Sequence, residues 1–148
     1  MRLQILQEIR NSVLIIFVLF IISCNKYNYN NIFDVSHVTG KKMTYINGVD
    51  GFFCEMSKQE FDSFKGKSKF KQWNSMKAGD CFYSKGVSIE SDYWGILDSE
   101  AEYSVNRNSK LEGEWPVVIY YPRSGRLLCI IAEMALLVNG DDEGIKSH

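Results

Sequence analysis

The stretch WPVVIYY, residues 115–121, and the stretch RLLCIIA, residues 126–132, together decide the fold. The first is rich in β-branched and aromatic residues, which is typical of a strand, and its Pro116 is tolerated near a strand start. PRSG, residues 122–125, joins the two as a turn. Because the second stretch is apolar almost throughout, we expect both of its faces to be buried. We therefore predict that this hairpin forms the centre of an antiparallel sheet.

A second hairpin is predicted upstream of the first. Residues 43–46 and 52–56 would be its strands, with the turn at either Asn47-Gly48 or Asp50-Gly51. Alternation along the second strand would place three side chains on one face: Phe52, Cys54 and Met56.

Ser57 begins the clearest helix in the chain. Ser57 and Glu60 match a capping box, in which each side chain accepts a hydrogen bond from the other residue's backbone. Phe61 and Phe64 are three residues apart and share one helix face, which suits docking on a sheet. Gly66 fits the position that follows the last helical residue.

These elements predict an α+β fold: a small antiparallel sheet of about five strands with one short capped helix packed on a face. Short strands at residues 81–84 and 87–90 complete the set. The globular domain is expected to span residues 41–140, and residues 141–148 a frayed tail.

The amino-terminal leader carries a different signal. Residues 13–22 are ten consecutive apolar residues, whereas crossing a hydrocarbon core takes about 20. Arg2 and Arg10 outweigh Glu8 before this run, and a positive segment followed by a short apolar one is typical of a secretory signal peptide. The alternative is a buried core helix, which would have no obvious partner at this end of the chain. We therefore predict a signal peptide over residues 1–23.

The end of this leader, Ile21-Ile22-Ser23-Cys24, resembles the lipobox of bacterial lipoproteins. The resemblance covers residues 1–24 only. It implies cleavage of the signal peptide between Ser23 and Cys24, with a diacylglyceryl group attached to the Cys24 thiol. Two or more acyl chains hold a protein stably on its membrane.

Residues 24–40 are interpreted as the lipidated amino terminus and a tether. Residues 25–31, NKYNYNN, are polar and repetitive and have little to pack. The resemblance thus implies a domain in the cell envelope, outside the cytoplasm, anchored to a bacterial membrane through acyl chains on Cys24. Asn25, in place of Asp, slightly favours the outer over the inner membrane.

The overall charge does not favour a nucleic-acid partner. The chain has 17 basic and 18 acidic side chains and a net charge of −1, which offers no broad footprint for a polyanion. Basic side chains predominate over residues 41–85 and acidic ones over residues 86–148. This polarity favours oriented docking to an envelope protein partner, or else the two halves attract one another.

A lysine-rich stretch is one candidate binding patch. Lys67, Lys69 and Lys71 precede Trp73, a pattern that suits an anionic ligand such as a lipid headgroup, a glycan or an acidic protein. A solvated face with Trp73 packed inward is the alternative, and we favour it.

Trp94 is the other candidate binding residue, and it lies in the acidic stretch of residues 90–102. This stretch lacks the ligand spacing of a calcium loop. We therefore expect a solvated acidic face, and neither a metal nor a cofactor.

Catalytic chemistry is hard to place on this chain. Besides the lipidated cysteine there are three others, Cys54, Cys81 and Cys129, compatible with one disulfide and one buried thiol or with three free thiols. Because Cys54 and Cys129 lie in apolar runs, we favour a structural role. The two histidines, His37 and His148, do not flank a rigid core element, and no nucleophile motif is present.

Three functions remain as expectations. The first is a lipid-anchored envelope protein with a small non-enzymatic binding domain, of inhibitor, immunity or accessory type. The second is an envelope lipoprotein that binds a glycan or lipid through exposed Trp and Tyr side chains. The third is a small envelope enzyme that uses Cys or carboxylates.

Overall fold

The computed structural model describes residues 4–10, 27–34, 40–109, 111 and 113–133. Cys24 and Ser23, most of the predicted leader and the predicted tail lie outside these ranges. Residues 4–10 are helical. Among the residues described, no helix is both long and apolar enough to span a membrane.

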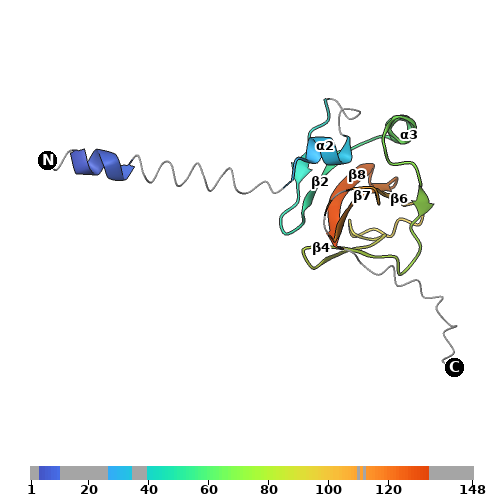
Figure 1. Ribbon diagram of the computed structural model, residues 1–148. Coiled ribbons are helices and arrows are strands. Elements are labelled where there is room, and N and C mark those ends of the chain that lie inside the picture. The colour runs from blue at the N-terminus through green and yellow to red at the C-terminus, as the bar shows by residue number, and fades with distance from the viewer. Residues whose placement is uncertain (1–3, 11–26, 35–39, 110, 112, 134–148) are drawn as a thin grey trace, which may run out of the picture.

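A six-stranded antiparallel sheet forms the centre of the fold, in the order β1-β2-β8-β7-β6-β3 (Figure 1). Its strands are β1 (Thr44–Tyr45), β2 (Gly51–Glu55), β3 (Asn74–Ser75), β6 (Glu102–Val105), β7 (Glu114–Tyr121) and β8 (Arg126–Glu133). A second sheet pairs β4 (Phe82–Ser84) with β5 (Val87–Ile89), and two short helices are α2 (Tyr29–Phe33) and α3 (Lys58–Lys67). The prediction of a mixed fold around an antiparallel sheet is confirmed, whereas its five strands and single helix are approximate.

The predicted central hairpin is present as β7 and β8. The two strands pair along their whole length, from Glu114 opposite Glu133 to Tyr121 opposite Arg126. Pro116 is accommodated because β6 ends at Val105, which pairs with Val117. The Pro116 carbonyl still accepts from the Asn106 N–H at 2.9 Å, and the missing N–H faces this position just past the end of β6.

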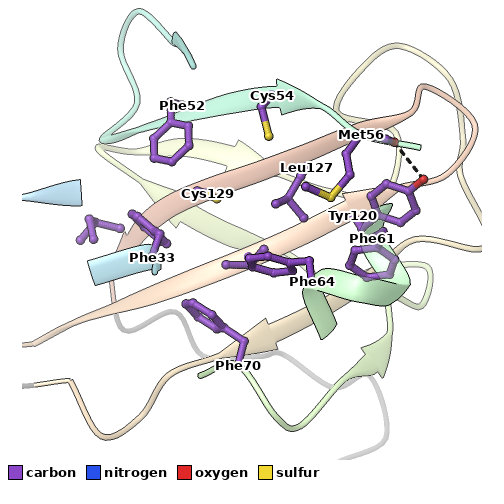
Figure 2. Packing of buried hydrophobic residues seen from close by; sticks show 12 residues of the cluster. Phe33, Phe52, Cys54, Met56, Phe61, Phe64, Phe70, Tyr120, Leu127 and Cys129 are labelled. Carbon is purple, nitrogen blue, oxygen red and sulfur yellow. Dashed lines mark hydrogen bonds between the residues drawn. The ribbon is translucent and has the colours of Figure 1, made fainter. Parts of the chain in front are cut away.

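One face of the sheet is covered by α2 and α3 (Figure 2). Phe61 of α3 is fully buried and stacks on Tyr120 of β7, with ring centroids 3.9 Å apart. Phe33 of α2 and Phe64 of α3 complete this aromatic layer. The predicted alternation along β2 is confirmed. Phe52 and Cys54 of β2, and Met56 directly after it, all enter this core.

The opposite face is covered by the β4–β5 hairpin. Phe82 and Ile89 from this hairpin pack on the sheet with Val49 and Met76. The sheet side chains below them come from β7 and β8, namely Val117, Ile119, Tyr121, Leu128 and Ile130. Burial of both faces explains why these two strands are almost continuously apolar.

The capping box of α3 is confirmed, but the predicted helix end is wrong. The Ser57 hydroxyl accepts from the Glu60 N–H at 3.3 Å, and the Glu60 carboxylate accepts from the Ser57 N–H at 2.7 Å. The helix continues past Gly66 to Lys67, because the Ser68 N–H still reaches the Phe64 carbonyl at 2.8 Å. Gly66 is therefore a helical residue.

The expectation that residues 25–31 have little to pack is wrong for the part described, residues 27–31. The Asn28 side chain caps α2 by accepting from the Asn31 N–H. Tyr27 and Tyr29 pack against the core beneath α2, and the Tyr27 hydroxyl donates to the Glu114 carboxylate. The folded part of the chain thus begins well before residue 41.

Candidate functional site

The lysine-rich stretch lies at the end of α3 and in the loop after it. Lys67, Lys69 and Lys71 are exposed, but two of them hold the chain: Lys69 donates to the Asn31 carbonyl, and Lys71 donates to the Gly66 carbonyl at 3.3 Å. Trp73 is half-buried, and its ring packs edge-on against Phe61. This is the geometry expected for a solvated face with Trp73 packed inward.

Charge in this region is partly neutralised within the domain. Glu102 of β6 lies between two lysines of α3, with its carboxylate 2.5 Å from Lys65 Nζ and 3.4 Å from Lys58 Nζ. These ion pairs join the basic residues 41–85 to the acidic residues 86–148. The two halves therefore attract one another at this point.

Trp94 lies on the other face of the sheet, so the structure does not bring it together with the lysine-rich stretch. Its ring contacts Phe53 and Tyr93 edge-on, at centroid distances of 4.8 Å and 5.0 Å. Its Nε1 is buried without a hydrogen-bond partner in the part of the chain described. Trp115 is also half-buried and lies beneath Arg107. Each of the three indoles thus has packing partners on its ring.

Arg126, at the start of β8, stacks on two aromatic rings. Its guanidinium carbon lies 4.4 Å from the Trp94 ring centroid and 5.1 Å from that of Phe53. The β2–β8 register places Glu55 opposite Arg126, yet the two do not form an ion pair. Within the described ranges, the guanidinium has neither a carboxylate nor a hydrogen-bond acceptor.

A hollow of about 350 Å³ opens beside this stacked arginine. We call it the Arg126 hollow, and it is lined by Gly40, Lys41, Lys42, Thr44, Phe53, Glu55 and Arg126. Lys41 is partly engaged, because its Nζ lies 2.6 Å from the Glu60 carboxylate. The lining therefore combines three cations with one carboxylate.

The segment of residues 90–101 forms a closed loop above the same face. Asp98, only 1 % exposed, accepts from the backbone N–H of Glu100 at 3.2 Å and of Arg123 at 2.8 Å. Its own N–H donates to the Ser91 carbonyl at 3.0 Å. The Tyr121 hydroxyl donates to the Glu90 carbonyl at 2.7 Å, and burial raises the Tyr121 pKa. The ends of the loop are therefore fixed to the sheet.

The tip of this loop exposes two apolar side chains. Ile96 is 54 % exposed and Leu97 is 60 % exposed. The Leu97 carbonyl is held by the Arg123 guanidinium at 3.0 Å. We call residues 91–98 the apolar-tipped loop. Among the residues described, no group of three or more His, Cys, Asp or Glu side chains is placed to hold a metal ion.

Cys54, Cys81 and Cys129, the cysteines in the described ranges, are free thiols. Burial raises the pKa of the Cys54 thiol to about 11, and burial together with neighbouring Cys54 raises the pKa of the Cys129 thiol well above its ordinary value. Cys81 is half-buried, and its Sγ lies 3.0 Å from Ser88 Oγ. A reactive thiol needs a lowered pKa and access to solvent, so Cys54 and Cys129 are suited to packing.

Sequence reasoning missed Arg126, Phe53, Lys42, Ile96 and Leu97 as candidates. Arg126 had a visible signal, because it is the one charged residue in the otherwise apolar stretch of residues 126–132. Ile96 and Leu97 follow Gly95, and apolar residues directly after a turn glycine are unusual in a solvated acidic stretch. Which side chains these residues contact depends on the fold, and no sequence pattern around them predicts those contacts.

Comparison of the chain with protein-family models, with curated protein sequences and with solved structures found no match. The fold and site by themselves define a small mixed α and β domain. Its two distinguishing surfaces are the apolar-tipped loop and the Arg126 hollow.

Proposed function

We propose that this chain is a lipid-anchored protein of the bacterial cell envelope whose domain binds a partner protein without catalysing a reaction. An inhibitor, immunity or accessory role fits this proposal. The observation that carries it is the apolar-tipped loop. Ile96 and Leu97 at its tip are exposed to solvent, and hydrogen bonds of Asp98 attach the loop to the rest of the domain. The raised pKa values of Cys54 and Cys129 argue against a thiol mechanism at those positions.

Exposed aliphatic pairs on an ordered loop favour contact with another protein. Complete burial of a Leu or Ile side chain stabilises by about 1.5–3 kcal/mol, so contact with both tip residues contributes several kilocalories. The hydrogen bonds of Asp98 keep the loop in one conformation before binding, which reduces the entropy lost on association.

Charge around the loop indicates the kind of partner. Asp92 and Glu100 flank the tip and are exposed, as is Glu90 at its base. A partner that presents an apolar patch surrounded by Lys or Arg is complementary to this surface. We therefore expect its association to weaken as salt concentration rises.

The anchor is tested by substitution of the predicted lipidated residue. Cys24→Ala removes the only sulfur to which the diacylglyceryl group would be attached in the lipobox-like motif, so metabolic labelling with a radioactive fatty acid should be lost. Ser36→Ala is a suitable control and should keep the label. Undiminished labelling of Cys24→Ala would refute the anchor.

The protein contact is tested by photo-crosslinking in intact cells. A benzophenone amino acid at position 97 should capture one defined protein, whereas the same group at position 71 should not. The double variant Ile96→Asn/Leu97→Asn should stop that protein from co-purifying, and Tyr83→Asn, which alters an exposed ring outside the loop, should not. Equal capture from positions 97 and 71, or unchanged co-purification with the double variant, would contradict the proposal.

A further inference from the structure

We propose that the Arg126 hollow is a binding site for the phosphate group of a small polyol phosphate ester. This inference goes beyond protein binding by the apolar-tipped loop and does not depend on it. It rests on the state of Arg126, on the charge of the lining residues and on the size of the hollow.

The state of Arg126 is the first observation. Trp94 and Phe53 hold its guanidinium through their ring faces, at 4.4 Å and 5.1 Å from the ring centroids. Cation–π contacts of this kind fix the plane of the group without using its N–H donors. Those donors have no acceptor in the part of the chain described, so they are positioned to receive two oxygens of one phosphate.

The charge of the lining is the second observation. Lys42 is exposed and, within the described residues, forms no ion pair, whereas Lys41 shares its charge with Glu60. Even with Lys41 paired to Glu60, Lys42 and Arg126 outnumber Glu55, so the hollow keeps a positive balance that attracts a phosphate anion. Because the cations come from the 40–44 segment and from β8, they approach the hollow from two sides.

The volume of the hollow and the carboxylate of Glu55 indicate what the rest of the ligand must be. A volume of about 350 Å³ lies at the lower end of the range for small-molecule sites. Glu55 is exposed and can only accept hydrogen bonds, so an O–H group on the ligand suits it whereas a phosphate does not. A phosphate ester that also carries hydroxyl groups, such as glycerol 3-phosphate, satisfies both ends of the hollow.

Trp94 supplies a spectroscopic reporter for this site. The chain has three tryptophans, so Trp73→Phe/Trp115→Phe leaves Trp94 as the only indole. Engagement of the stacked guanidinium by phosphate changes the field at the Trp94 ring. We expect glycerol 3-phosphate to give a saturable fluorescence change in the full chain in mild detergent, with ionic strength held constant by chloride.

Matched variants separate a built site from general attraction of anions. Arg126→Lys keeps the charge and loses the planar fork, and should weaken binding by about tenfold or more, since hydrogen bonds to charged groups contribute roughly 1.5–3 kcal/mol. Lys42→Gln should also weaken binding, and Lys71→Gln, which removes a charge on the other face, should not. The thermal midpoint of each variant shows whether it is folded.

The proposal is overturned if fluorescence does not saturate with glycerol 3-phosphate. It is overturned equally if Lys42→Gln and Lys71→Gln weaken binding by the same factor, or if Arg126→Lys binds as tightly as the unaltered protein. Competition by dihexanoyl phosphatidylglycerol supports a lipid headgroup as the source of the ester, and its absence supports a free solute. Failure of the Ile96 and Leu97 experiment leaves these outcomes unchanged.

Discussion

Phe61→Ala should destabilise the domain more than any substitution on the exposed side of α3. Phe61 is fully buried, stacks on Tyr120 at 15° and 3.9 Å, and meets Trp73 edge-on at 5.0 Å. Substitutions of buried Phe by Ala cost about 3–5 kcal/mol, and the cost is greater where the site cannot collapse. Collapse is restricted here, because the Tyr120 hydroxyl is held by the Met56 carbonyl at 3.1 Å (Figure 2). We therefore expect a loss of about 4 kcal/mol.

Urea unfolding of the full chain in mild detergent measures this loss, with Trp fluorescence and circular dichroism as independent probes. Gln59→Ala, on the exposed side of the same helix, should change the free energy of unfolding by no more than about 0.5 kcal/mol. The reasoning is refuted if Phe61→Ala costs less than about 1 kcal/mol, because α3 would then contribute little to the core.

The cap of α3, the buried thiols and the half-buried Tyr29 phenol can each be tested separately. Ser57→Ala removes the hydroxyl that caps α3 and should lower the free energy of unfolding by about 1 kcal/mol; an unchanged urea midpoint would contradict this. A thiol reagent should label Cys81 in the folded protein but Cys54 and Cys129 only after unfolding, as read by mass spectrometry; labelling of folded Cys54 would show that its packing is wrong. Burial raises the pKa of Cys54 to about 11 and that of Tyr29 to about 12. The unfolded chain ionises first as pH rises, so stability should be complete below about pH 9 and fall above it; equal urea midpoints at about pH 8 and pH 11 would refute this linkage.

The long strands and α3 could be predicted because their signals are contained in the segments themselves. Burial of β7 and β8 on both faces requires near-continuous apolar runs, and these are visible in residues 115–121 and 126–132. The capping box of α3 involves only Ser57 and Glu60, which are three residues apart. Patterns that lie within one short segment, such as these, can be recognised without knowledge of the fold.

The elements that were missed depend on contacts made elsewhere. β3 is two exposed residues, and β6 becomes a strand because it pairs with β7. α2 has five residues, too few for a helix to be stable alone, and it is stabilised by burial of Phe33. The Arg126 hollow is assembled from segments more than seventy residues apart in the chain, so no local pattern could predict it.

The position of β8 has a consequence for the order in which the sheet is completed. β8 is hydrogen-bonded to β2 on one side and β7 on the other, and it is the last strand described. Until it is present, β2 has only the two-residue β1 as a partner. A chain that emerges amino end first, from a ribosome or a translocation channel, therefore cannot close its sheet before residue 133 has emerged. Pairing of β2 with β8 joins residues far apart in the chain, and such non-local contacts form slowly.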